Sequence, residues 1–384
     1  MKNETTTYRI VCRAVMCWRV VCGRIACCVF LCLPGVAQTV DIQPAWDFAV
    51  SGDSRNCGDV VMPGIAHKAR ADGAAFYWHL GDFRAISDFD QDFKRAQPQA
   101  TVAAYLGGAW PDFIAQQLGG FGDLPVYLAL GNHETTPPKT RAEATLQFAD
   151  WFGAPALRAQ RLKDDPSDHT VRTYYHWIER GVDFITLDNA SSDQFDDAQV
   201  RWFDGVIQRA AANSAIKSVV VGMHEALPDS LTAGHSMNES AQGTKSGRAV
   251  YQQLVHLRNQ TRKNVYVLAS HSHFVMNNIY DTACRKSDPE SVLPGWIVGT
   301  AGAVRYRLPA DVGAASVART DVYGYLLGTV AANGEISFQF KELKQDEVPA
   351  ETRQKYSEEL VEECFRRNAS PIVLQGPAGP PNCP

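Results

Sequence analysis

Short apolar runs in this chain end in glycine or small residues that are followed by polar side chains. In the clearest case, the run at 126–130 is followed by Gly131, Asn132, His133 and Glu134. A continuous apolar run of this length is typical of a buried strand. Open α/β sheets place their ligand sites beyond the carboxyl ends of such strands. The polar residues after the run are therefore candidates for a site, although an Asn-His pair can also cap the next helix.

Four further apolar runs end in the same way, at 46–52, 75–81, 218–222 and 264–270. Segments with apolar positions at helical spacing lie between or after these runs, at 59–72, 140–152, 196–212 and 247–259. Alternating strands and helices are typical of an α/β domain.

The last part of the chain is predicted to form strands, at 274–280, 295–300, 321–331 and 335–342. Asn333-Gly334 between the last two strands is a strong hairpin signal. The strands predicted at 174–178 and 182–187 form a second hairpin.

Two polar segments, 153–172 and 229–247, are expected to be loops. The second is about twenty residues long, and loops of that length inside a compact domain tend to be functional or mobile. A charged helix is expected at 350–367, followed by a tail rich in proline and glycine.

The N-terminus has the features of a secretory signal. Four arginines precede an unbroken apolar run at 25–33, and small residues follow up to Ala37. This pattern predicts a signal peptide over residues 1–37, with export to the periplasm or the outside of the cell. The run is too short for an ordinary transmembrane helix, so no stable span is expected after cleavage, and a retained membrane anchor is the alternative. The basic region is long for a signal, which suggests Met16 as the true start.

Removal of residues 1–37 changes the charge and the cysteine count. It takes away five of the 37 basic and one of the 42 acidic residues, which leaves 32 against 41 and a formal charge of −9. An acidic chain is a poor candidate for binding extended nucleic acid. Four cysteines in an exported chain suggest two disulfides with three possible pairings. A Cys364–Cys383 bond would tie down the tail, but the sequence does not choose among Cys57, Cys284, Cys364 and Cys383.

The residues after the apolar runs form a possible set of metal ligands. They are carboxylate, amide and imidazole donors, namely Asp53, Asp82, Asn132, His133, His224, His271 and His273. No cysteine is among them, which argues against a zinc-finger-like site, and the mixture suits Mn, Zn or Fe. A single histidine or aspartate at such a position is usually a core or capping residue. Five such endings in one chain are hard to explain independently, so the set is interpreted as a metal site.

The order and spacing of these endings resemble the motif pattern of the calcineurin-like metallophosphoesterases. Within that superfamily the chain resembles a secreted, bacterial-type member that is distantly similar to purple acid phosphatases. The matching segments are Gly52-Asp53-Ser54-Arg55, Gly81-Asp82, Gly131-Asn132-His133-Glu134, Gly222-Met223-His224-Glu225 and Ser270-His271-Ser272-His273. The resemblance implies a four-layer α/β sandwich in which helices flank two mixed sheets. It places the catalytic domain at 38–345 and leaves a C-terminal helix and tail at 346–384.

The resemblance also implies a centre with two metal ions. Asp82 would bridge the ions, Asp53 and His273 would hold the first ion, and the second would be held by Asn132, His224 and His271. A metal-bound hydroxide would attack phosphorus, and His133 would steady the phosphoryl oxygen or protonate the leaving oxygen. The chemistry suits these residues, because a bound metal brings the pKa of water near 7 and imidazole titrates near the working pH.

Three positions depart from the family pattern. Arg55 stands where many members have a histidine, and a guanidinium cannot ligate a metal ion. The first ion would then bind weakly or complete its shell with water, or Arg55 would bind substrate phosphate or pair with a carboxylate such as Asp59. We assign Arg55 to substrate binding. Ala85 stands where purple acid phosphatases carry a ligating tyrosine, so no tyrosinate–iron centre is expected. Ser270 replaces a glycine.

The other polar residues receive structural interpretations. Arg84 is expected to form a surface salt bridge, with substrate contact as the alternative, and His235 is expected to be solvated in the loop at 229–247, again with substrate contact as the alternative. His79 and His176 lie inside predicted strands and are expected to be structural.

The sequence therefore predicts a metal-dependent phosphoester hydrolase with a small phosphorylated substrate. A phosphomonoesterase is favoured. The alternatives are a phosphodiesterase or nucleotide hydrolase, and a member that binds phosphate without turnover.

Overall fold

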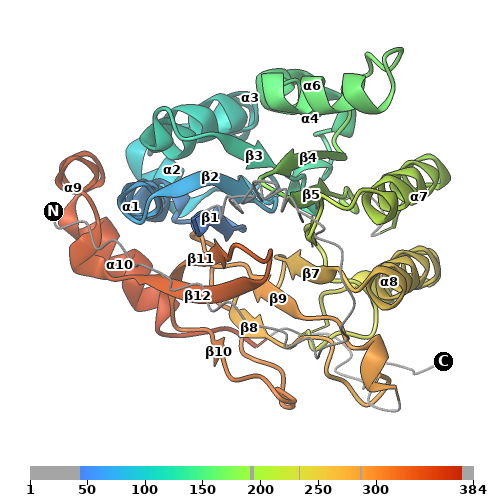
Figure 1. Cartoon of the computed structure of the whole chain (residues 1–384). Coiled ribbons are helices and arrows are strands. Elements are labelled where there is room, and N and C mark those ends of the chain that lie inside the picture. The colour runs from blue at the N-terminus through green and yellow to red at the C-terminus, as the bar shows by residue number, and fades with distance from the viewer. Residues whose placement is uncertain (1–43, 191–193, 233, 286–287, 374–384) are drawn as a thin grey trace, which may run out of the picture. The chain divides into compact units, whose positions relative to one another are not determined.

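The computed structural model describes residues 44–373, apart from 191–193, 233 and 286–287. The predicted signal peptide at 1–37, Cys383 and the Pro- and Gly-rich tail lie outside the described residues. The described chain consists of two mixed β-sheets flanked by helices (Figure 1). This arrangement confirms the predicted fold class.

The first sheet has five strands in the order β12-β11-β1-β2-β3. Strands β1, β2 and β3 are parallel, and β11 and β12 extend the sheet in antiparallel orientation on the other side of β1. The strands are β1 (Trp46–Ser51), β2 (Ala74–His79), β3 (Val126–Leu128), β11 (Tyr323–Val330) and β12 (Ile336–Leu343). The hairpin predicted at Asn333-Gly334 joins β11 and β12.

The second sheet has seven strands in the order β10-β8-β9-β7-β6-β5-β4. Four neighbouring strands, β9, β7, β6 and β5, are parallel, and the others are antiparallel to their neighbours. The strands are β4 (Tyr175–Glu179), β5 (Val182–Thr186), β6 (Ser218–Gly222), β7 (Asn264–Ala269), β8 (Val275–Asn277), β9 (Gly295–Val298) and β10 (Ala318–Arg319). The β4–β5 hairpin was predicted.

Helices cover the outer faces of the two sheets, except that those between residues 102 and 164 pack against the core between the sheets (Figure 1). They are α1 (Gly58–Ala71), α2 (Gln91–Ala96), α3 (Val102–Phe113), α4 (Arg141–Gln147), α5 (Ala149–Phe152), α6 (Pro155–Asp164), α7 (Asp197–Ala212), α8 (Ala241–Thr261), α9 (Ala350–Tyr356) and α10 (Glu358–Asn368). A π-helical turn, Ile114–Leu118, follows α3. Short 3₁₀ turns are Gly119–Phe121, Asn132–Glu134, Met237–Glu239, Pro289–Ser291 and Gln345–Glu347.

Alternation along the strands sorts the side chains into one inner and two outer layers. In β1, Phe48 lies in the core between the sheets, whereas Ala49 belongs to the cluster that contains α1 and α10. In β6, Val220 lies in the inner core, and Val219 packs with α7 and α8. The result is a four-layer sandwich with helices outside and two sheets inside.

Aromatic side chains join the two sheets across the inner core. Tyr127 of β3 stacks on Trp177 of β4 with ring centroids 3.9 Å apart, and Phe48 of β1 meets Phe184 of β5 edge-on at 5.0 Å. Such pairs contribute about 0.5–1.5 kcal/mol each beyond their buried area. They fix one sheet against the other, so residues at the ends of strands from both sheets can form one site.

Two segments predicted as loops contain helix. The prediction for 153–172 is wrong, because α6 begins there with Pro155 at its first turn. Leu157 and Gln160 are the two buried residues of α6, so it has too few buried apolar positions for the sequence to indicate a helix. Helix α8 begins at Ala241 rather than near 247, because Ser240 accepts the Gly243 N–H at 2.8 Å and caps it. The helix predicted at 350–367 is split into α9 and α10 at Ser357, where φ is 69°.

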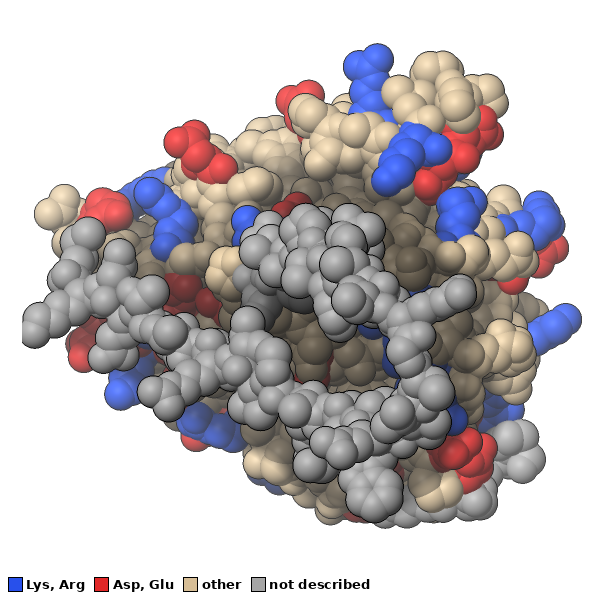
Figure 2. Space-filling model, viewed as in Figure 1, with Lys and Arg blue, Asp and Glu red and all other residues tan. Residues whose placement is uncertain are grey.

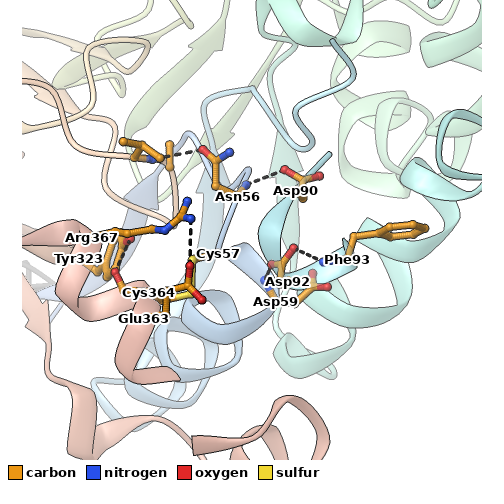
Figure 3. Close-up of a disulfide and its surroundings, with 12 residues drawn as sticks. Asn56, Cys57, Asp59, Asp90, Asp92, Phe93, Tyr323, Glu363, Cys364 and Arg367 are labelled. Carbon is orange, nitrogen blue, oxygen red and sulfur yellow. Dashed lines mark hydrogen bonds and ion pairs between the residues drawn. A yellow bond between two sulfur atoms is a disulfide. The ribbon is translucent and has the colours of Figure 1, made fainter. Parts of the chain in front are cut away.

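A disulfide ties the C-terminal helices to the first sheet layer. Cys57 precedes α1 and is bonded to Cys364 of α10, 307 positions away (Figure 3). The Cys364–Cys383 pairing considered from the sequence is therefore wrong. Cys284 is also disulfide-bonded. Within the described residues, no helix has the length and apolar character needed to cross a membrane.

Candidate metal centre

The predicted ligands lie where strands of both sheets end. Asp53 follows β1, Asp82 follows β2, and Asn132 and His133 follow β3 in the first sheet. The second sheet contributes His224 after β6 and His271 and His273 after β7. The two sheets meet at this edge, because Asn132 Oδ1 lies 3.1 Å from His224 Nε2.

The backbone is strained at three of these positions. Asp53, Asp82 and His271 have φ values of 60°, 61° and 63°, which non-glycine residues rarely adopt. Each such residue costs about 1–3 kcal/mol, and such strain persists mainly at functional sites. Gly131 is required beside them, because a Cβ there would collide with Asp82 Oδ1.

Four of the side chains form what we call the His224 group, which consists of Asp82, Asn132, His224 and His271. The ligand atoms of its carboxylate and two imidazoles lie within 4.8 Å of one another. His224 Nε2 lies 3.3 Å from Asp82 Oδ1 and 3.0 Å from His271 Nδ1. All three residues are therefore close enough for one ion to contact them together.

The proton positions favour a cation in the His224 group. His224 Nδ1 donates to the Leu80 carbonyl at 2.8 Å, so Nε2 is the nitrogen that faces Asn132 and His271. Burial acts to lower the pKa of His224, but the Asp82 carboxylate outweighs it and raises the pKa to about 9. Positive charge is thus stabilised here, which a metal ion would also supply.

A second set, the Asp53 group, consists of Asp53, Asp82 and His273. Its ligand atoms also lie within 4.8 Å of one another, and Asp53 Oδ1 is 3.2 Å from His273 Nε2. Asp53 Oδ1 and Asp82 Oδ2 are buried and have no hydrogen-bond partner within the described residues. A buried carboxylate oxygen without a partner is costly, so this group also attracts a cation.

Arg55 occupies the space beside the Asp53 group. Its Nη2 lies 3.0 Å from His273 Nε2 and 3.1 Å from the Tyr306 hydroxyl, and its Nη1 lies 2.5 Å from His133 Nε2. Its Nε is 3.7 Å from Asp82 Oδ2. The suggested ion pair with Asp59 is absent from the described structure, since Asp59 contacts Arg84 instead.

His133 is oriented by two backbone contacts. Its ring Nδ1 contacts the Ala85 carbonyl, and its backbone N–H donates to Asp82 Oδ1 at 3.1 Å. Because Nδ1 donates to the carbonyl, Nε2 carries the lone pair that accepts from Arg55. Burial lowers the pKa of His133, and the Arg55 charge acts in the same direction.

Three residues beside the centre were not predicted. The Glu134 carboxylate accepts the N–H groups of Asp82, Phe83 and Gly131 at 2.8–2.9 Å and so holds two strand ends together. The Tyr306 ring stacks on His273 with centroids 3.8 Å apart. His235 meets His271 edge-on at 4.6 Å and its side chain is 26% exposed, so it lies beside the centre although part of it reaches solvent. Glu134 lies within the motif Gly131-Asn132-His133-Glu134, whereas no motif in the sequence around Tyr306 indicates a site.

The expected surface salt bridge of Arg84 is also wrong. Its side chain is fully buried and contacts the carboxylates of Asp59, Asp92 and Asp112. His79 is buried in β2 and contacts Ser54 Oγ at 3.0 Å. His176 is buried between Asp164 and Asp183. Both histidines lie in strands and not at the centre, as expected.

Comparison with known proteins establishes the class of fold. No family model and no curated protein matches the sequence. The structure is similar to a purple acid phosphatase isolated from yellow lupin (Lupinus luteus) seeds, with a TM-score of 0.50 and 15% identity over 78% of this chain and 52% of that chain. The structure of PhoD is similar with a TM-score of 0.47 and 12% identity over 84% of this chain and 78% of that chain. The chain thus spans about half the length of the lupin enzyme.

Proposed function

We propose that this chain is a metal-dependent phosphoester hydrolase. The observation that carries the proposal is the His224 group, in which the ligand atoms of Asp82, His224 and His271 lie within 4.8 Å of one another and Asn132 Oδ1 lies 3.1 Å from His224 Nε2. The fold shared with a purple acid phosphatase supports it. The donor set of imidazoles, a carboxylate and an amide suits Mn, Zn or Fe.

In this proposal the metal ligands, Arg55 and His133 have different roles. Asp82, Asn132, His224 and His271 hold the ion, which when bound polarises a phosphoryl oxygen and lowers the pKa of water. Arg55 supplies a second, permanent positive charge for the phosphoryl group. His133 holds that guanidinium in place through Nε2.

A small phosphomonoester is the proposed substrate. On the visible part of the face in Figure 2, acidic and basic side chains alternate and no broad basic area is seen. Together with the acidic balance of the predicted mature chain, this disfavours extended nucleic acid. We also propose that the chain is exported, which the Cys57–Cys364 disulfide supports.

A phosphate-binding protein without turnover is the second candidate. It is favoured by the same Arg55–His133 contact, because a histidine whose Nε2 accepts from arginine has no proton there to give to a leaving group. A phosphodiesterase is the remaining alternative within the enzymes.

The test is an assay of the purified protein with p-nitrophenyl phosphate and with its bis ester, after loading with Mn, Zn or Fe. We expect turnover of the monoester that a chelator abolishes and added metal restores. Faster turnover of the bis ester would identify a phosphodiesterase. Phosphate binding measured by calorimetry without turnover of either ester would support the second candidate.

A further inference from the structure

We infer that the guanidinium of Arg55 takes the place of a metal ion in the Asp53 group, so that the chain binds one ion, in the His224 group. The inference rests on the metal site of the proposed function. It replaces the two-ion centre that the family resemblance implies, and it makes the site one metal ion paired with one arginine.

Arg55 occupies the ligand atom that a metal ion in the Asp53 group would need. His273 Nδ1 donates to the Val304 carbonyl at 2.6 Å, so the ring has one lone pair left, on Nε2. Arg55 Nη2 lies 3.0 Å from that nitrogen. An imidazole lone pair that accepts a hydrogen bond cannot also coordinate a cation, so an ion could enter only by displacing Arg55.

Several hydrogen bonds also hold the Arg55 guanidinium in this position. Three acceptors from separate parts of the chain surround it, namely His133 Nε2, His273 Nε2 and the Tyr306 hydroxyl. Tyr306 is itself stacked on His273. The Arg55 side chain is only 15% exposed. Its removal from this position would leave two lone pairs and a buried hydroxyl unsatisfied, which opposes displacement by an ion.

The net charge of the centre also opposes a second ion. Asp53 and Asp82 contribute two negative charges, and Arg55 offsets one of them. One divalent ion then brings the centre to a net charge of plus one, whereas a second ion bound beside Arg55 would bring it to plus three. Such an excess in a buried site is unfavourable, because charges a few ångströms apart repel strongly at reduced dielectric.

The His224 group differs in this respect. Within the described residues, the side chains of Asn132, His224 and His271 make no hydrogen bond or ion pair with a lysine or arginine. Their ligand atoms face one another, and Asp82 is the residue that the His224 group and the Asp53 group have in common. This asymmetry assigns the ion to one side of Asp82 and the guanidinium to the other.

The experiment counts bound metal. The purified protein is titrated with Mn²⁺, the ions per chain are measured by elemental analysis after gel filtration, and the electron paramagnetic resonance spectrum is recorded. We expect one ion per chain and a spectrum of isolated Mn²⁺. In Arg55→His, we expect two ions and the signal of a spin-coupled pair, because the new imidazole adds a ligand and removes the competing charge.

Two further variants keep the test decisive. Arg319→His is the matched control, since Arg319 is 45% exposed and its ion pairs within the described residues are with Asp321 and Glu342, so it should keep one ion. His273→Gln should also keep one ion, whereas His271→Gln should lose it. The His273 and His271 variants test the assignment even if Arg55→His does not fold.

The outcomes separate the inference from the proposed function. Two ions in the unaltered protein, or loss of the ion in His273→Gln, would overturn the inference and leave a hydrolase possible. One ion without turnover of any ester would support the inference and count against the hydrolase. Absence of any bound ion would overturn both.

Discussion

The chain buries aspartates in two neighbouring clusters that differ in what their oxygen atoms contact. In the metal centre, Asp53 Oδ1 and Asp82 Oδ2 have no hydrogen-bond partner within the described residues. The other cluster surrounds the fully buried Arg84, which contacts or faces four carboxylates. We call it the Arg84 cluster; its buried aspartates are Asp59, Asp90 and Asp92, and the partly exposed Asp112 lies at its edge.

Donors from the backbone and side chains satisfy the Arg84 cluster. Asp90 accepts the Asn56 N–H at 2.6 Å and the Tyr105 hydroxyl at 2.7 Å. Asp92 accepts the Asp59 N–H at 2.7 Å. Figure 3 shows these carboxylates beside the Cys57–Cys364 disulfide. Every carboxylate of the cluster therefore has a partner, and the cluster ties α1, α2 and α3 together.

The comparison separates two uses of buried charge. A buried carboxylate whose oxygens all accept hydrogen bonds stabilises the fold, and its loss leaves a partner charge unpaired. A buried carboxylate with an oxygen free of hydrogen bonds is costly without a ligand, which is typical of a binding site. Changes in the two clusters should therefore affect different measurements.

The largest expected effect is that of Asp82→Asn in the metal centre. It removes the charge shared by both groups, so we expect loss of bound metal and a fall in kcat/KM of about 10³-fold or more. The metal-free protein should lose less stability than Arg84→Met does, about 1–2 kcal/mol, because the amide can still accept from the His133 backbone N–H and the His224 imidazole can lose its proton once the carboxylate is gone. Elemental analysis, the phosphate ester assay and urea denaturation measure the three quantities.

The opposite result would remove the distinction between the clusters. If Asp82→Asn lowered the free energy of unfolding by several kcal/mol and kept its metal, Asp82 would be a structural residue. The conservative variant Asp82→Glu gives an intermediate case, since it keeps the charge but moves it. It should bind metal more weakly than the unaltered protein and more tightly than Asp82→Asn.

The next effect is that of Arg84→Met in the Arg84 cluster. Removal of the guanidinium leaves buried carboxylates unpaired, so we expect the free energy of unfolding to fall by about 3–5 kcal/mol. The folded fraction should keep its metal and its KM, because Arg84 contacts none of the proposed ligands. Arg319→Met, at an exposed position, is the control and should change stability by less than about 0.5 kcal/mol.

The strand ends were predictable because the apolar runs are short and are closed by glycine or serine. Strand β6 was predicted at its observed bounds, 218–222, since every residue of it is buried and the run has a sharp end. The structure brings the seven predicted site residues and Arg55 into one site, because parallel strands direct their carboxyl ends to the same edge. The roles of these residues stay predictions.

The missed features depend on contacts between residues that are distant in sequence. Arg84 is buried only because three separate helices bring aspartates around it, and an isolated Arg in a sequence suggests the surface. Tyr306 reaches the centre from a segment without regular structure, 251 positions after Arg55. The Cys57–Cys364 pairing likewise spans 307 positions. No periodicity in the sequence encodes such contacts.

The smallest expected effect concerns a third buried charge, His176, between Asp164 and Asp183. Burial acts to lower the pKa of His176, but the two carboxylates outweigh it and raise the pKa to about 9. Its stabilising contribution is therefore fully present below about pH 6.5, the ordinary pKa, and is lost as the pH rises through about 9. We expect urea denaturation to show a decline of up to about 3 kcal/mol over this window, which His176→Gln removes. His67→Gln, at an exposed position of α1, should keep the decline. Equal pH profiles for the unaltered protein and His176→Gln would show that these carboxylates hold a neutral imidazole, so that His176 contributes no buried charge.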